Sequence, residues 1–196
     1  MAITFPLSLP STTGIAQVTL RAHNAVSTSQ SPFTFKRQVI AHTGQAWSAS
    51  VSVPRGDRST HAEWTAFLTS LKAGVGTFLL GDPDYATPRG TVSACTLTGS
   101  AGDETVTVTM TGSLLAGDYI QLGSGTSAKL HKVLQDQTGD GSLEIWPALR
   151  SDYTSETVVF NNAKGVFALP NNVSEWSIVP SGNYDISFEA QEVITG

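Results

Sequence analysis

The chain has 196 residues, of which 40 % are hydrophobic and 14 % charged, and its formal net charge is −5. Soluble proteins usually carry about 25 % charged residues, and such depletion is typical of surfaces that contact other subunits, although a Thr-rich β protein would also show it. The chain has no basic run, so it lacks the electrostatic footprint of a nucleic-acid-binding protein. Cys95 is the single cysteine, which excludes an internal disulfide and a cysteine-based zinc site.

The first residues predict neither a secretion signal nor a membrane anchor. Residues 1–14 have no positively charged start and no long apolar core, and no stretch approaches the roughly 20 apolar residues of a membrane span. We therefore expect synthesis in the cytoplasm of the producing cell and no membrane partner.

Period-two alternation of apolar and polar residues predicts strands in the first part of the chain. The runs are residues 14–20, 33–43 and 46–53. In the last run, one face carries Trp47, Ala49, Val51 and Val53. Gly44 and Gln45 lie between two runs and predict a hairpin or short turn.

One segment has helical spacing instead. Apolar residues recur at i, i+3, i+4 and i+7, which is one stripe of a helix; they are Trp64, Phe67, Leu68 and Leu71. Thr60 and Glu63 have capping-box spacing, while Lys72 fits the last turn and Gly74 the C-terminal cap. We expect one α-helix over about residues 60–73, lying on a sheet because nothing else in the chain can cover its stripe.

Beyond the helix, residues 76–80 predict a short buried strand and Gly81–Gly90 a turn-rich loop. Seven short strands then follow, separated by Gly-rich turns, and this spacing is typical of a small barrel. They are 92–98, 104–111, 118–122, 129–135, 142–146, 157–160 and 166–169, with a hairpin turn at Asp140-Gly141.

The C-terminal residues 184–193 predict one long strand whose inward side carries Ile186, Phe188, Ala190 and Glu192, so that side is apolar only part of the way. The fold class that we expect is mainly β, with a β-sandwich or barrel-like core and one helix. Residues 1–90 with 171–196 would form this core domain. Residues 91–170 would form an inserted small β-barrel of the OB-like kind.

No motif predicts an enzyme, a cofactor or a metal. Asp136 to Gly141 begins like a calcium loop, but the twelfth position is Pro147 where such a loop needs a bidentate Glu, so a turn is the better interpretation. The four histidines have no ligand-pair spacing, and no nucleophile motif or P-loop is present. Paired carboxylates of the kind that a cell-wall hydrolase needs are also missing.

Tryptophans leave a second class of function open. Trp47 and Trp64 belong to the apolar faces of a strand and a helix, whereas Trp146 and Trp176 remain unassigned. The alternative is therefore a carbohydrate- or receptor-binding module of a phage or bacterial surface, in which the barrel binds the carbohydrate or receptor.

The order of several motifs resembles a known family. These motifs are the strand 46–53 with its "VSVP" ending, the helix "EWTAFL", the strand and loop "GTFLLGDP", and the ending "NYDISFEAQE". They are similar to the distal and minor tail proteins of long, non-contractile-tailed phages, the family represented by minor tail protein M of phage lambda. The similarity covers about residues 35–90 and 174–193, and this chain departs from the pattern by some eighty residues inserted after the Pro-containing loop.

The resemblance implies a structural virion protein, assembled in the host bacterial cytoplasm, that forms a ring at the distal end of the tail tube. That ring is usually sixfold. Its partners would be other copies of itself, the tail tube protein and the tail tip or baseplate hub protein. Because they lie outside the predicted core and are rich in Pro, two segments are expected to contact neighbouring subunits. Their residues are Ile3, Phe5, Pro6, Gly81, Asp82, Pro83, Asp84, Tyr85, Pro88 and Arg89.

Overall fold

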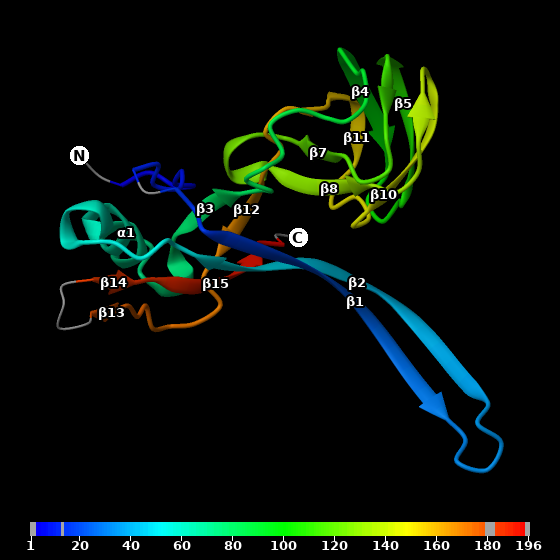
Figure 1. The fold of residues 1–196 in the computed structure, drawn as a ribbon. Helices are drawn as coiled ribbons and strands as arrows, with labels where there is room; N and C mark the ends of the chain where they lie inside the picture. The colour runs from blue at the N-terminus through cyan, green and yellow to red at the C-terminus, as the bar shows by residue number, and fades with distance from the viewer. Residues whose placement is uncertain (1–2, 13, 179–182, 195–196) are drawn as a thin grey trace.

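The computed structural model describes residues 3–12, 14–178 and 183–194 and shows a mainly β protein (Figure 1). Its helical elements in these ranges are α1 (Arg58–Ser70) and two short 3-10 turns, Ala73–Val75 and Gly125–Ser127. The strands are β1 (Gln17–Gln30), β2 (Arg37–Ser52), β3 (Thr77–Leu80), β4 (Ala94–Gly99), β5 (Thr105–Thr111), β6 (Ser113–Leu114), β7 (Tyr119–Leu122), β8 (Lys129–Val133), β9 (Gln137–Thr138), β10 (Gly141–Trp146), β11 (Tyr153–Thr157), β12 (Gly165–Ala168), β13 (Ser177–Ile178), β14 (Tyr184–Asp185) and β15 (Ser187–Glu192). The predicted fold class, mainly β with one helix and barrel-like curvature, is confirmed.

The first large sheet combines both ends of the chain. Its five strands lie in the order β1-β2-β15-β12-β3, and each neighbouring pair is antiparallel. The N-terminal segment extends the β3 edge, because Leu7 forms a parallel bridge with Phe78. The C-terminal strand β15 therefore lies in the middle of a sheet that begins near the N-terminus.

One face of this sheet forms the first hydrophobic core. The four alternating residues predicted to share a face of β2, Trp47, Ala49, Val51 and Val53, are all buried. Helix α1 covers part of this face with its predicted stripe, and Phe67 meets Phe78 with the ring centroids 5.5 Å apart. Helix and sheet thus bury complementary apolar faces, which is the packing that the sequence pattern predicts.

The helix ends differ from the prediction. Asp57, not Thr60, is the N-cap residue, and its side chain accepts a hydrogen bond from the backbone N–H of Thr60. At the other end Leu71 is the C-cap, and Lys72, with φ of 47°, takes the left-handed position expected for Gly74. The helix is therefore shifted about two residues toward the N-terminus, because an Asp carboxylate caps free N–H groups better than a Thr hydroxyl does.

The second large sheet has six strands in the order β11-β4-β5-β10-β8-β7. Strand β5 alternates strictly, with Val106, Val108 and Met110 buried and its threonines exposed. The sheet curls so far that Val159, just after β11, bridges Gln121 of β7. The resulting half-barrel encloses a second hydrophobic core of its own.

Strand pairing places the end of this second unit earlier than predicted. The expected insert, residues 91–170, includes β12, yet β12 pairs with β3 and β15 of the first sheet. The expected strand at 157–160 also lies earlier, as β11. Gly165 allows the return to the first sheet, since a Cβ there would come within 3.0 Å of the Leu130 side chain.

The predicted turn at Gly44-Gln45 is wrong. Strand β2 runs through both residues, and the hairpin that joins β1 to β2 turns at residues 31–36 instead. The pairing of β1 with β2 is interrupted there by a shift in register between Asn24 and Val26, which lie opposite residues 41–45. The result is a long two-stranded ribbon that leaves the body of the protein (Figure 1).

The packing of α1 predicts a large loss of stability when its stripe is shortened. Leu71→Ala removes a fully buried side chain, so the free energy of unfolding should fall by about 2–5 kcal/mol. Val75→Ala is the matched control: Val75 is 76 % exposed, and its loss should change stability by less than about 0.5 kcal/mol. Urea unfolding followed by tryptophan fluorescence measures both, and equal effects would contradict the packing described.

Candidate functional site

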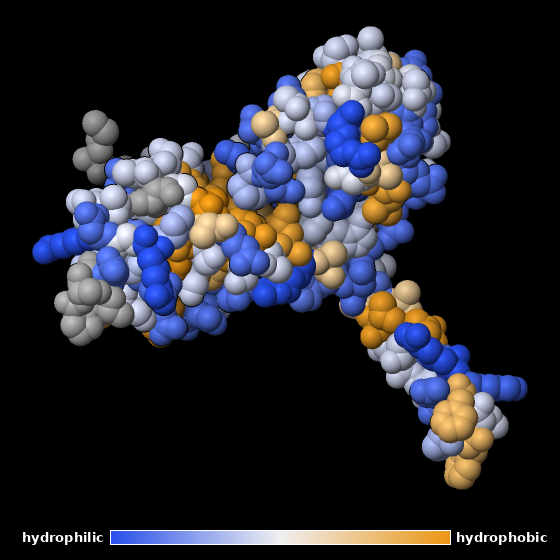
Figure 2. All heavy atoms as spheres, in the orientation of Figure 1, coloured by the Kyte–Doolittle hydropathy of each residue, from blue (hydrophilic) through white to orange (hydrophobic). Residues whose placement is uncertain are grey.

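The most exposed element of the molecule is the outer part of the β1–β2 ribbon, residues 25–44, here called the arm. Every residue of the arm except Ser31 is exposed. Large apolar side chains are among them, with Val39 51 %, Phe35 74 % and Phe33 92 % exposed. Figure 2 shows this as hydrophobic surface at the base and at the tip of the arm.

Neither face of the arm is covered by the described part of this chain. Val26 and Val39 lie on one face and Ile40 on the other, as their cross-strand register requires. A two-stranded hairpin is only marginally stable in water by itself, and its free edges can pair with strands of other chains. The arm therefore has the properties of a surface that another chain covers.

The base of the arm is fixed by the second sheet. Two facing residues of the ribbon, Asn24 and Gln45, mark this point. Asn24 accepts a hydrogen bond of 2.8 Å from the indole of Trp146. Gln45 donates to Glu104 at 2.6 Å, and its side-chain oxygen accepts from the backbone N–H of Ala148 at 2.7 Å. The predicted turn position is thus an anchoring point, which sets the direction in which the arm projects.

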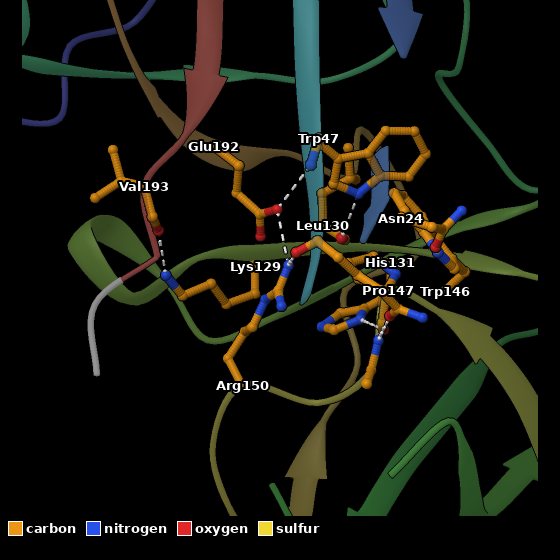
Figure 3. Close-up of polar contacts among 12 residues, drawn as sticks. Asn24, Trp47, Lys129, Leu130, His131, Trp146, Pro147, Arg150, Glu192 and Val193 are labelled. Atoms are coloured by element: carbon orange, nitrogen blue, oxygen red, sulfur yellow. Dashed lines mark hydrogen bonds and ion pairs between the residues drawn. The ribbon is translucent and has the colours of Figure 1, made fainter. Parts of the chain in front are cut away.

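Beneath this point the two sheets meet in a buried polar junction, drawn in Figure 3. Arg150 and Glu192 form an ion pair of 3.0 Å whose side chains are 10 % and 2 % exposed. Glu192 also accepts a hydrogen bond from the backbone N–H of Trp47, and Arg150 donates to the carbonyl of Gln45. The charged pair therefore links β15, β2 and the second sheet at one place.

Aromatic side chains surround the ion pair. The Trp47 indole donates to the carbonyl of Leu130 at 2.9 Å, and its ring meets that of Trp146 edge-on with centroids 4.5 Å apart. The ring of Tyr119 also packs against Trp47, with the centroids 6.2 Å apart. Edge-to-face geometry is favoured for aromatic pairs, so these rings stabilise the contact beyond the area that they bury.

Two further buried basic residues, Lys129 and His131, belong to the junction. Lys129 donates to the carbonyl of Val193 at 2.7 Å, and burial lowers the pKa of its ammonium group. His131 donates through Nδ1 to the carbonyl of Pro147 at 2.7 Å. Burial lowers the pKa of His131 to about 4, with the charges of Arg150 and Lys129 acting in the same direction, so the ring is neutral at pH 7.

The N-terminal residues expected to contact neighbouring subunits lie along the edge of the first sheet. Ile3 is 54 % exposed, whereas Phe5 and Pro6 are half-buried and Phe5 packs against the first core. Their role between subunits stays a prediction.

The other predicted contact segment, Gly81–Gly90, connects the two sheets. Its two end glycines are in close contact with the second unit, since a Cβ on Gly81 would lie 2.2 Å from the Ala163 carbonyl oxygen and one on Gly90 would lie 2.0 Å from that of Ser113. Pro83, Asp84 and Arg89 are exposed, while Asp82, Tyr85 and Pro88 are half-buried.

Contacts within the chain account for several of these loop residues. Tyr85 donates to the carbonyl of Tyr119, and burial with the nearby charge of Asp118 raises its pKa to about 12. The buried Asp118 carboxylate accepts from the backbone N–H groups of Arg89, Gly90 and Leu115. The loop therefore orients the half-barrel, and a shallow hollow brings it together with the N-terminal segment at Ser8 and Leu9.

Potential metal ligands are not clustered in the described ranges. Among the described residues, no three His, Cys, Asp or Glu side chains lie close enough together to hold a metal ion. Asp136 and Asp140 each accept a hydrogen bond from a backbone N–H of another segment, Asp136 from Ala116 and Asp140 from Met110. No helix in the described ranges is long and apolar enough to span a membrane.

Of the four tryptophans, Trp176 is the most exposed residue, at 38 %. Trp47 and Trp64 are buried, as predicted, and Trp146 is held between Trp47 and Asn24. A sugar-stacking platform would thus have to rest on Trp176 and the helix residues beside it, Thr65, Ala66, Thr69 and Ser70.

No protein-family model matches the chain, and no curated protein matches it.

The residues of the junction could be predicted only in part. Glu192 stands in line with Ile186, Phe188 and Ala190, and a carboxylate on an apolar strand face signals a buried partner. Nothing local marks Arg150, His131 or Lys129 as that partner, because they lie far away along the chain.

The ion pair predicts unequal effects for two arginines. Arg150→Ala leaves the Glu192 carboxylate buried without its counter-charge, so the free energy of unfolding should fall by about 3–5 kcal/mol. Arg55→Ala breaks an ion pair with Asp185 whose side chains are 74 % and 46 % exposed, and should cost less than about 1 kcal/mol. Urea unfolding measures both, and a small effect at Arg150 would mean that the junction does not hold the sheets together.

His131 predicts a specific loss of stability in mild acid. The ring has an ordinary pKa of 6.5 when unfolded and about 4 when folded, so the unfolded chain binds the proton more tightly. The stabilisation is complete above pH 6.5 and lost as the pH falls toward 4, to a total of about 3 kcal/mol.

The measurement is urea unfolding of wild type and His131→Gln at a series of pH values between those limits. Wild type should lose more stability than the variant across this window. His42→Gln, on the exposed arm, is the control and should behave as wild type does. Parallel pH profiles for wild type and His131→Gln would contradict the assignment.

Proposed function

We propose that this chain is a structural protein of a phage tail, forming a ring at the distal end of the tail tube and linking the tube to the tail tip or baseplate hub. The observation that carries the proposal is the arm, whose apolar residues and strand edges are left uncovered by the described part of the chain. Large exposed apolar patches mark interaction sites in soluble proteins. An assembly subunit is the class of protein that needs such an element.

The construction of the body supports an assembly role. The arm is not a loose appendage, because its base is bonded to the second sheet through Asn24 and Gln45 above the Arg150–Glu192 pair. A fixed direction is what a closed ring requires, since each copy must meet the next at the same angle. The low charged fraction, 14 %, fits surfaces that are partly covered on assembly.

The partners that follow from the proposal are other copies of the chain, the tail tube protein above the ring and the hub protein below it. A sixfold ring assembled in the host bacterial cytoplasm is the arrangement that the motif resemblance implies. The half-barrel, with its own core, would be a peripheral domain of each subunit.

The carbohydrate-binding alternative has weaker support. Trp146 is half-buried and held by Trp47 and Asn24, and the hollow beside the more exposed Trp176 is lined by small helix residues without a charged or amide side chain. Sugar sites combine an aromatic platform with convergent polar groups, which this hollow lacks.

The test is gold labelling of particles from the producing culture with an antibody against this chain, viewed by electron microscopy. We expect label confined to the tail tip, either on intact particles or after brief dissociation that exposes buried epitopes. The antibody must recognise the denatured protein, and an antibody against the tube protein serves as the control for the rest of the tail. Absence of label from every particle after dissociation would reject the proposed function.

A further inference from the structure

The charges of the chain are divided between its first and remaining parts. All 16 acidic residues occur from Asp57 onward, together with seven of the 11 basic residues. The first 56 residues hold four basic residues, Arg21, Lys36, Arg37 and Arg55, and no acidic one. The arm is therefore purely basic, while the body that follows is strongly acidic.

At the arm tip, basic and aromatic side chains occur together. Phe33 and Phe35 are among the most exposed apolar residues described, and Lys36 and Arg37 follow directly. Ser31 orders the turn, because its carbonyl accepts from the N–H of Phe35 and its N–H donates to the carbonyl of Lys36. Phe35 has a φ of 54°, in the left-handed region that non-glycine residues rarely adopt. The tip thus presents two rings beside two cations in a defined turn.

A hollow of complementary character lies between α1, β15 and the segment 169–175, here called the groove. Its apolar lining includes Leu68, Leu169, Val173 and Phe188. Two carboxylates, Glu175 and Glu189, lie in the same lining. Glu189 is paired with Arg21, while Glu175 is exposed and has no ion pair in the described part of the chain.

The rim of the groove is apolar as well. Val173 is 72 % exposed, and the segment that continues from it exposes Trp176 and Ile178. Exposed apolar residues next to the unpaired Glu175 carboxylate match the composition of the arm tip.

The arm of the same molecule cannot fill this groove. Figure 1 shows the arm tip and the α1, β13 and β14 end of the molecule on opposite sides, with the first sheet between them. Two complementary surfaces at opposite ends of one chain form a head-to-tail contact, which closes into a ring when the rotation between copies allows it.

We infer that the groove receives the arm tip of a second copy, with Phe33 and Phe35 against its apolar lining and Lys36 and Arg37 facing Glu175 and Glu189. This inference rests on the proposed function and names the contact through which the ring would form. Charge complementarity selects a copy of this chain as the occupant, because the arm carries no acidic residue and the groove no basic residue.

The first test is a charge swap in the full-length chain, followed by analytical ultracentrifugation. Lys36→Glu/Arg37→Glu and Glu175→Lys/Glu189→Lys should each abolish concentration-dependent self-association. An equimolar mixture should restore it, because each copy then meets a neighbour of opposite charge. Lys72→Glu/Lys164→Glu changes the net charge equally at two exposed positions of the body and should leave self-association unchanged. Raising the salt concentration should weaken the wild-type association.

A second variant tests the apolar part of the proposed contact. Phe33→Ser/Phe35→Ser should weaken self-association by about 30-fold or more, the usual consequence of removing aromatic anchors from an interface. The substitutions lie at exposed positions, so circular dichroism should show an unchanged fold.

A cross-link then locates the contact. Phe35→Cys mixed with Val173→Cys should give a covalent dimer with a short bis-maleimide, since the only native thiol, Cys95, is buried. Phe35→Cys mixed with Thr107→Cys, an exposed half-barrel position, should not.

A monomeric wild type, unaltered association of both arm variants, or no selective cross-link would overturn the inference. Those results combined with gold label at the tail tip would reject this contact while the tail function stands, and the arm would then bind the tube or hub protein. If neither this contact nor the gold label at the tail tip is found, the proposed function is rejected too.

Discussion

The ion pair between Arg150 and Glu192 is the interaction on which the arrangement of the two sheets depends. It lies between β15, the central strand of the first sheet, and the end of the half-barrel, and Trp47 binds both units through its backbone and its indole. A buried pair of this kind contributes little net stability compared with apolar packing, but breaking it is costly because one charge is left alone. It therefore acts mainly to allow one relative position of the sheets and to penalise others.

That constraint extends to the arm. Gln45 accepts and donates hydrogen bonds at the junction, and its own carbonyl is bound by Arg150. The ribbon thus leaves the body from a point held by the buried pair. In the proposed ring, the direction of a projecting element would matter as much as its composition, since a small angular error accumulates from one subunit to the next. The junction therefore determines the direction in which the arm projects.

Several residues identified in the sequence have other structural roles than those predicted for them. The loop 81–90 is tied to the half-barrel by Tyr85 and by the amide groups that bind Asp118, so much of it serves the chain itself. Trp47, just after the predicted turn at 44–45, lies at the junction. Phe33 and Phe35, which belonged to a predicted strand, instead form the turn of an exposed tip. The arm is thus an uncovered surface that loop composition did not indicate.

Much of the local structure could be read from the sequence because its causes are local. Strict alternation determined which residues of β2 and β5 face a core, and the spacing of Trp64, Phe67, Leu68 and Leu71 determined the helix and its buried side. The mainly β class and the barrel-like second unit followed from the same periodicities. One kind of error arose where two local signals compete, as at the helix N-cap, where Asp57 prevails over Thr60.

Only the tertiary structure decided where β12 pairs, what neutralises Glu192 and whether Gly44-Gln45 is a turn or part of a ribbon. Each of these depends on residues distant in sequence: β3 and β15 for β12, Arg150 for Glu192, and the half-barrel for Gln45. Alternation states that a strand has two faces but not what lies against them. An apolar residue on the uncovered arm and one in a core have the same pattern, and only the contacts of the folded chain distinguish them.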